Sequence, residues 1–469
     1  MSPIPPPPTG LVYGWVSSAD IRGTRDILVS SLSTIWLCTW TSLCLNIPPQ
    51  HIRAHRIRWL FNKFKWQLFA IFFPEVLVAT AAEQWLSARQ SARAFARLGY
   101  PEWTIRHAFF ADMGGIVVAP PDVPPFPVDS QQLAYLVANK HLALPSLSTE
   151  DIRSMNKADG LARVVTMAQM AWFCLSCAAR GASGLGFCTL EVTTLAYILC
   201  TAHTFFFWYY KPLDPEAQRT FVMHTSMADI RDRDADAAGK ASKLPPSYMH
   251  TPLDFIKPPP DPKSLIAPFW FGLDATFRPF PPKGRRRWWR WKTPGGGPQV
   301  VPVEKKKQTA PPIAPGITPV KTLANSRVLP EEGISTALML YTLLFQVAYF
   351  GLHIGFAWVT FFPSQTEWLL WIVSTAVDFG LIVLYLLAIP VGTHLAPYLG
   401  RLLFDMEATH LLEVAHALPP WAKLVIHAPF VLGYVVARMA VLVESVMSLR
   451  VVPESVYRDV NWTSFLPHV

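Results

Sequence analysis

Apolar residues gather along this chain in windows of about 20 residues that contain almost no charge, the length that a helix needs to cross a hydrocarbon core of roughly 30 Å. The pattern predicts an all-α fold, a polytopic helical membrane bundle of about 6–7 spans with a large proline-rich basic insert. The expected windows are 27–47, 66–86, 162–179, 185–210, 336–361, 368–390 and 424–447, of which 162–179 is the weakest.

Polar and proline-rich stretches between these windows divide the chain into segments. In 87–161, basic residues spaced by four predict an amphipathic helix at the membrane interface, and a proline cluster after it predicts a loop. In 212–334, repeated prolines, glycines and lysines predict an insert with no fold of its own. The expected segments are an N-terminal tail (1–26), two membrane helices (27–86), the amphipathic and proline-rich loop (87–161), two further apolar helices (162–211), the basic insert (212–334), the C-terminal membrane helices (335–448) and a C-terminal tail (449–469).

Composition supports a membrane protein and argues against a nucleic-acid-binding one. Hydrophobic residues make up 51% of the chain and charged residues 16%, whereas a typical soluble domain has about 25% charged residues. The net charge is +9, but the cations lie between the apolar windows and no nucleic-acid recognition motif accompanies them. The lipid bilayer is the expected partner. Anionic lipid headgroups are expected to bind where cations alternate with tryptophans in the insert, at Arg285, Arg286, Arg287 and Arg290.

Ionisable residues inside the apolar windows are the candidates for chemistry, because a charge at the centre of a bilayer costs at least about 2.5–3.5 kcal/mol. Arg438 and Asp378 lie near the middles of neighbouring windows, so we expect Asp378 to neutralise Arg438, with Glu75 or Glu191 as the alternative partner. Two interpretations stay open. The pair is either a structural contact between helices or part of a polar pocket that holds a substrate or relays protons.

Three polar residues of the window 336–361 share one helical face. Gln346, Tyr349 and His353 are spaced i, i+3 and i+7. His353 has the chemistry of a general base, since its unperturbed pKa is near 6.5. A buried histidine that only hydrogen-bonds a neighbouring helix is the alternative. The candidate catalytic residues are therefore Asp378, His353 and Glu191, and the candidate substrate-binding residues are Arg438, Glu75, Gln346 and Tyr349.

Motifs for metals and nucleotides give little support to other chemistry. Glu407, His410, Glu413 and His416 have a spacing that fans across a helix, and the aspartates from Asp229 to Asp236 alternate with arginines as on a solvated face, so no metal site is expected. No nucleotide-binding glycine loop or serine-hydrolase elbow is present, and the sequence specifies no cofactor. Asn461 begins a glycosylation sequon, which is usable only if the C-terminus is lumenal.

Several stretches resemble a family of fungal multi-pass membrane proteins without a settled activity. The resemblance covers most of the chain outside the insert, and it rests on Arg22-Gly-Thr24, Leu37-Cys-Thr-Trp-Thr41, Asn46-Ile-Pro48, Lys157-Ala-Asp159, Trp172-Phe173, Lys211-Pro-Leu-Asp214 and Val460-Asn-Trp462. It implies a fungal source and an internal membrane, the endoplasmic reticulum. Its relatives lie among genes for specialised metabolites. It implies no reaction and no catalytic residue.

These observations lead to one main hypothesis and two alternatives. The main hypothesis is an enzyme that acts on a lipophilic substrate, an isoprenoid or an acyl lipid, in the biosynthesis of a specialised metabolite. The first alternative is a transporter or permease for a small lipophilic metabolite, against which the sequence shows no inverted repeat. The second alternative is a membrane scaffold without catalytic activity that uses the basic insert to hold lipids or proteins.

Overall fold

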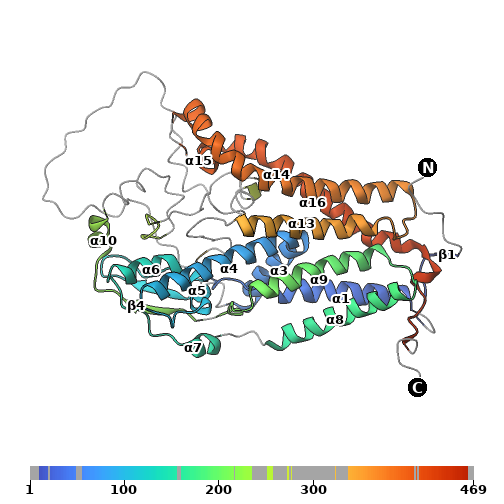
Figure 1. The fold of residues 1–469 in the computed structure, drawn as a ribbon, viewed down its shortest axis with the longest axis horizontal. Coiled ribbons are helices and arrows are strands. Elements are labelled where there is room, and N and C mark those ends of the chain that lie inside the picture. Colours follow the sequence, from blue (N-terminus) through green and yellow to red (C-terminus); the bar gives the residue numbers. More distant parts are fainter. Residues whose placement is uncertain are drawn as a thin grey trace.

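Long helices lying side by side make up most of this computed structural model (Figure 1). The structure describes residues 10–18, 22–48, 55–155, 160–215, 217–234, 251–256, 272–273, 276, 323, 336–405, 408 and 411–462. The long helices are α1 (Thr24–Thr41), α3 (Arg56–Phe72), α4 (Pro74–Arg97), α8 (Gly160–Ala182), α9 (Thr189–Phe207), α13 (Thr336–Phe356), α14 (Gln365–Phe404) and α16 (Pro420–Met447). A short helix, α15 (Leu411–Ala417), connects the last two.

Five of the described helices are long and apolar enough to cross a membrane, namely α8, α9, α13, the first part of α14, and α16. A sixth is reached if α3 and α4 together count as one broken span. The weakest expected window, 162–179, is among the five as α8, whose apolar side chains are mostly exposed. The structure therefore reaches the lower end of the expected 6–7 spans only when the broken pair is included.

The first expected window, 27–47, does not form a span of full length. Helix α1 ends at Thr41, and the rest of the window is not helical. The helix carries many serines and threonines, and it is not among the helices apolar enough to cross a membrane. Several of these hydroxyls donate to a backbone carbonyl one turn earlier, as Thr34 does to Ser30. The expectation failed here because apolar residues alternate with hydroxyl residues along the window.

The second expected window, 66–86, is broken at Phe73, where α3 and α4 meet at an angle of 107°. Pro74 is the first residue of α4, and Phe73 has a backbone conformation outside the helical region (φ −132°, ψ 52°). A proline lacks the N–H that would continue the preceding helix, and it disfavours helical geometry in the residue before it. The second half of the window continues as α4 to Arg97, so the expected amphipathic helix is the end of α4 and no separate element.

The window 368–390 also continues beyond its expected end. Helix α14 runs for 40 residues to Phe404, 14 residues beyond the expected end of the window. A helix of this length extends about 60 Å, roughly twice the thickness of a hydrocarbon core. In the part that follows Ala388, α14 is joined to α15 and α16 at one end of the bundle (Figure 1).

A small α/β subdomain lies at one end of the helices (Figure 1). It contains a three-stranded sheet in the order β3 (Phe126–Pro127), β2 (Ile116–Ala119) and β4 (Arg219–Val222), in which β2 pairs antiparallel with β3 and parallel with β4. Its helices are α5 (Ile105–Asp112), α6 (Ser130–Ala138), α7 (Thr149–Ser154) and α10 (Met227–Arg233).

Both the loop expected at 87–161 and the start of the insert expected at 212–334 contribute to this subdomain. Ile116 and Phe126 pack with Met223, Ile230 and Leu253 in one buried core. This subdomain is not evident from the sequence, because each segment is too short and too rich in proline to bury a core alone. The structure pairs segments about 100 residues apart, and each then covers the apolar side of the other.

The two ends of the described chain are joined by a second sheet. Strand β1 (Leu11–Tyr13) pairs antiparallel with β5 (Val451–Pro453), which follows a 3₁₀ turn at the end of α16. Arg180 of α8 donates hydrogen bonds to the backbone carbonyls of Ser455, Val456 and Arg458. The C-terminal segment is therefore fastened to the start of the bundle.

Candidate functional site

Arg438 is a buried cation in the middle of α16. Its Nη2 lies 3.0 Å from Oε2 of Glu75 on α4, and its Nε lies 3.5 Å from Oδ2 of Asp378 on α14. All three side chains are buried. An unpaired charge in the interior costs several kcal/mol, so each charge here needs the others. The expected ion pair of Arg438 with Asp378 is present, and Glu75 joins it as a second and closer partner.

Glu75 reaches Arg438 because α4 begins beside it. It is the second residue of α4, directly after the bend at Phe73 and Pro74. The first N–H groups of a helix have no acceptor within the helix and carry a partial positive charge, which favours a carboxylate at this position. The bend that interrupts the expected span therefore serves to place an acidic side chain inside the bundle.

Two tyrosines complete the shell around the guanidinium. The hydroxyl of Tyr349 on α13 accepts a hydrogen bond of 2.6 Å from Arg438 Nη1, and the hydroxyl of Tyr434 accepts one of 2.6 Å from Nη2. Tyr434 also donates to Oε1 of Glu75. We call Arg438, Glu75, Asp378, Tyr349 and Tyr434 the Arg438 cluster. Its members come from α4, α13, α14 and α16.

Asp378 is the least satisfied member of the cluster. Neither of its carboxylate oxygens accepts a hydrogen bond from the part of the chain that the structure describes, and its side chain is 0% exposed. The contact with Arg438 is an ion pair without hydrogen-bond geometry. Buried polar groups are hydrogen-bonded in the large majority of cases, so this carboxylate calls for an explanation in terms of function or bound molecules.

The expected polar face of α13 points toward the same place. Gln346, Tyr349 and His353 are all buried. His353 Nδ1 lies 3.1 Å from the carbonyl of Tyr349, whereas its Nε2 has no partner among the described residues. The Oε1 atom of Gln346 also has none there. The i, i+3, i+7 spacing thus places three polar groups on one side of α13. The Tyr349 hydroxyl is hydrogen-bonded to Arg438, whereas Oε1 of Gln346 and Nε2 of His353 have no partner among the described residues.

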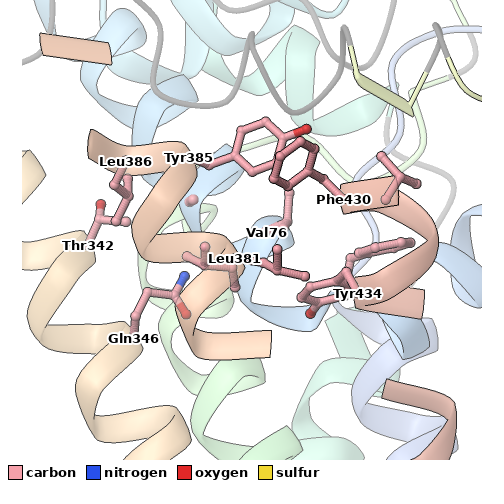
Figure 2. A pocket seen from close by; sticks show the side chains of 12 residues that line it. Val76, Thr342, Gln346, Leu381, Tyr385, Leu386, Phe430 and Tyr434 are labelled. Atoms are coloured by element: carbon pink, nitrogen blue, oxygen red, sulfur yellow. The ribbon is translucent and has the colours of Figure 1, made fainter. Parts of the chain in front are cut away.

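An apolar cavity lies between the same four helices. Its empty space is about 620 Å³, the open mouth included. Figure 2 shows Gln346 and Tyr434 at one end and Tyr385 with Phe430 at the other. The walls between them are almost entirely hydrocarbon, from residues such as Val76.

Three of these helices connect the cavity with the Arg438 cluster. On α14, Asp378 lies one turn beyond the cavity-lining residues Leu381 and Ile382 and two turns beyond Tyr385. On α16, Arg438 lies one turn beyond Tyr434. On α13, Tyr349 lies one turn and His353 two turns beyond Gln346. Of the Arg438 cluster, Tyr434 lines the cavity, and the other members lie within about one helical turn of lining residues. We therefore call the cluster the polar floor of the cavity, with Tyr434 and Gln346 at the boundary.

The described residues of the insert contact side chains that line this cavity, and we call its end at Tyr385 and Phe430 the mouth. Leu273 packs against Phe73, Val76 and Tyr434. Gly272 is buried, and a Cβ atom there would lie 2.5 Å from the hydroxyl oxygen of Tyr385. A side chain at this position would require Tyr385 or the insert backbone to shift.

A family model matches residues 7–230 and 336–469, and its description is Family of unknown function (DUF8562). The chain belongs to this family. No curated protein and no solved structure matches the chain. The family match includes every member of the Arg438 cluster and leaves out residues 231–335, which contain most of the basic insert. The cavity and its floor are thus built from the part of the chain that defines the family.

Glu191, one of the three catalytic candidates, lies outside the Arg438 cluster. Its Oε1 is 2.5 Å from Nη2 of Arg22 and 4.0 Å from Nε of Arg180, and its Oε2 accepts a hydrogen bond from the backbone of Cys188. It therefore caps the start of α9 and joins α9 to the residues before α1. The sequence grouped Glu191 with Asp378 because both are acids in apolar windows, but Glu191 does not face Arg438.

The remaining sequence candidates add nothing to the site. Arg285, Arg286, Arg287 and Arg290 lie outside the described residues, as do the side chains of Glu407, His410, Glu413 and His416. Asn461 is exposed. Among the described residues, no group of three histidine, cysteine, aspartate or glutamate side chains is placed to hold a metal ion.

A second hollow lies in the α/β subdomain, beside His107 and Leu147. Burial lowers the pKa of His107, whose Nε2 bonds the carbonyl of Leu147 and whose Nδ1 bonds Thr104. Both ring nitrogens are used, so this histidine holds α5 to the loop before α7.

Tyr434 is the cluster member that sequence reasoning missed. It is one turn before Arg438 on α16, and this i, i+4 spacing was visible in the sequence. Tyrosines are common in membrane helices, where they usually lie at the interface with water. The specific signal was a tyrosine one turn away from a buried arginine, because such a hydroxyl can satisfy the guanidinium.

Proposed function

We propose that this protein is an integral membrane protein of fungal internal membranes, in the endoplasmic reticulum, and that it is an enzyme acting on a lipophilic substrate, an isoprenoid or an acyl lipid, in specialised metabolite biosynthesis. Membrane integration is supported by the outer surfaces of the apolar helices. Leu344 of α13, Val436 of α16 and Leu369 of α14 are each more than half exposed, and a lipid environment would cover such side chains.

One observation carries the proposal of an active site. The Asp378 carboxylate is fully buried without a hydrogen-bond donor among the described residues, one turn of α14 from the cavity-lining residues Leu381 and Ile382. A cavity of this kind takes a hydrocarbon body, and a few polar groups at one end orient the reactive part. An acid or base inside apolar walls is also the arrangement that proton-transfer catalysis uses.

The residues of the floor divide the work in this proposal. Asp378 accepts the proton of the substrate, because it has free acceptor atoms. Arg438, which is held by Glu75, compensates the negative charge of Asp378 before the proton transfer. His353 Nε2 supplies a second group that exchanges a proton.

Turnover by the purified protein tests the proposal. The protein is reconstituted in phosphatidylcholine nanodiscs, supplied with isoprenoid and acyl lipids, and products are followed by mass spectrometry. We expect conversion that Asp378→Asn and His353→Ala abolish while both variants keep the wild-type elution profile. Glu367→Gln is the matched acidic control, because Glu367 pairs with the exposed Arg450 away from the cavity.

Two other results would replace this function. Flux of a lipophilic solute into sealed vesicles without conversion, lost in the same variants, would show a transporter. A scaffold would be shown by two results together. Every floor variant would keep full function in cells, and deletion of residues 283–307 would cause the same cellular defect as loss of the whole protein.

A further inference from the structure

At the floor of the cavity, both Nη atoms of Arg438 already have acceptors, whereas the carboxylate oxygens of Asp378 have no donor in the described chain. Arg438 directs Nη1 to Tyr349, Nη2 to Tyr434 and Glu75, and Nε toward Asp378. The hydroxyl of Tyr434 donates its hydrogen bond to Glu75. Both oxygens of Asp378 remain without a donor in the described chain.

The charges of the floor also favour a hydrogen-bond donor or a cation over an anion. When both are ionised, Glu75 and Asp378 carry two negative charges against the single positive charge of Arg438. In an interior of low dielectric, one uncompensated carboxylate repels an anion strongly and attracts a cation or a proton donor. A carboxylate or phosphate headgroup would bring a further negative charge to this place, where Arg438 already contacts two carboxylates.

We propose that the ligand of this cavity is a lipophilic alcohol or amine, whose hydroxyl or ammonium group donates hydrogen bonds to Asp378. The inference rests on the proposed function and specifies its substrate class. The hydrocarbon part lies along the walls, where Phe430, Leu381 and Val76 offer apolar contact. From Tyr385 to Asp378 the cavity and its floor extend about 10 Å along α14, which is seven residues of helix.

The opposite orientation places the head group at the mouth. There, the Nδ1 of His427 and the hydroxyl of Tyr385 lie near Gly272, and a fatty acid with its carboxylate at this end would push its methyl terminus toward Asp378. This would leave a buried carboxylate against hydrocarbon, which is costly. The head-at-floor orientation avoids this cost, and the two orientations predict opposite head-group preferences.

A set of ligands with one tail and four heads tests the inference on the unchanged protein. Dodecanol, dodecylamine, dodecanoate and dodecyl phosphate are titrated into the protein in phosphatidylcholine nanodiscs, and empty nanodiscs provide the partition background. We expect the alcohol and the amine to bind at least about tenfold more tightly than the acid and the phosphate. Tighter binding of the acid or the phosphate would overturn the inference and place the head group at the mouth.

A variant locates the head group. Asp378→Asn removes the excess charge and keeps an acceptor atom, so the advantage of dodecylamine over dodecanoate should shrink about tenfold, while Glu367→Gln should leave it unchanged. An amine advantage that survives in Asp378→Asn would overturn the placement at Asp378. If this variant does not fold, the four-ligand titration of the wild-type protein still decides between the orientations.

The outcomes also separate this inference from the proposed function. If the acid or the phosphate binds best and is converted, the cavity is an active site and only the substrate class is wrong. If none of the four ligands binds above the nanodisc background and no lipid is converted, the cavity is not a ligand site and both proposals fail.

Discussion

Tyr434 and Arg438 lie one helical turn apart on α16, and both bind the same carboxylate, that of Glu75 on α4. Glu75 therefore receives one neutral and one charged donor from a single helix face. Asp378, by contrast, meets Arg438 only through a contact of 3.5 Å and receives no hydrogen bond from the described chain. The two acids of the cluster thus differ in how fully they are hydrogen-bonded.

The different bonding of the two acids predicts different costs for their removal. Glu75→Gln leaves Arg438 without its close ionic partner, and breaking a buried pair in this way lowers the free energy of unfolding by about 3–5 kcal/mol. Asp378→Asn should cost less than about 1.5 kcal/mol, since no hydrogen bond is lost. Thermal unfolding in detergent measures both. An equal loss in the two variants would show that Asp378 is as structural as Glu75.

The hydroxyl of Tyr434 should matter more than its ring. Tyr434→Phe keeps the aromatic stacking with Phe73 but removes the donor to Glu75 and the acceptor for Arg438, at a cost of about 1–3 kcal/mol. Tyr398→Phe, at a position on α14 that is 75% exposed, should change stability by less than about 0.5 kcal/mol. Chemical unfolding of the two variants checks this, and equal stability would contradict the bridging role.

Glu191 should affect stability and leave turnover unchanged. Glu191→Gln weakens the buried contact with Arg22 and lowers the melting temperature, but it lies apart from the cavity floor. The activity per folded molecule should therefore stay within about twofold of wild type, a change of roughly 0.4 kcal/mol in the barrier. Loss of turnover in a folded Glu191→Gln protein would return this residue to the catalytic candidates.

Gly272 should be sensitive to a single added methyl group. Gly272→Ala places a carbon 2.5 Å from the hydroxyl oxygen of Tyr385, so either the insert or the tyrosine must move, and dodecanol binding should change. Tyr385→Phe removes that oxygen, and the double variant should recover binding in a double-mutant cycle. Gly351→Ala on α13 is the control, since its added carbon meets nothing within 4 Å. An unchanged affinity in Gly272→Ala would show that the insert does not contact the mouth in solution.

Lys211 should give the protein a stability that rises with alkaline pH. Its side chain is buried after the end of α9, where it donates to Gln84 and lies over the Trp208 ring, and burial lowers its pKa from 10.5 to about 8. Between these values the unfolded chain binds the proton and the folded chain does not, so the free energy of unfolding rises with pH by up to about 3 kcal/mol.

Lys211→Met tests this dependence. The stability of the wild type relative to this variant should increase from pH 8 to pH 10.5, because only the wild type gains from releasing the proton. Unfolding curves of both proteins at each pH give the difference. A difference that stays constant over this range would contradict the depressed pKa.

Part of the site was accessible from the sequence because helix periodicity is local. The spacing of Gln346, Tyr349 and His353 fixed a common face, and the cost of a charge in an apolar helix identified Arg438 and Asp378 as needing partners. The same cost could not choose among partners. Glu75 and Glu191 are equally acidic in the sequence, and only the packing of α4 against the bundle decides which of them meets Arg438.

The apolar windows and the buried ionisable residues were thus determined by the sequence alone, since both follow from side-chain chemistry and a period of 3.6 residues. Tertiary structure decided the bend at Phe73, which brings Glu75 to the inside, and the position of Tyr434 between Glu75 and Arg438. It also decided the α/β subdomain, in which Ile116 and Ile230 share a core. These features depend on contacts between segments that lie far apart in the chain, and a local pattern of apolar and polar residues carries no information about which distant segment will be the neighbour.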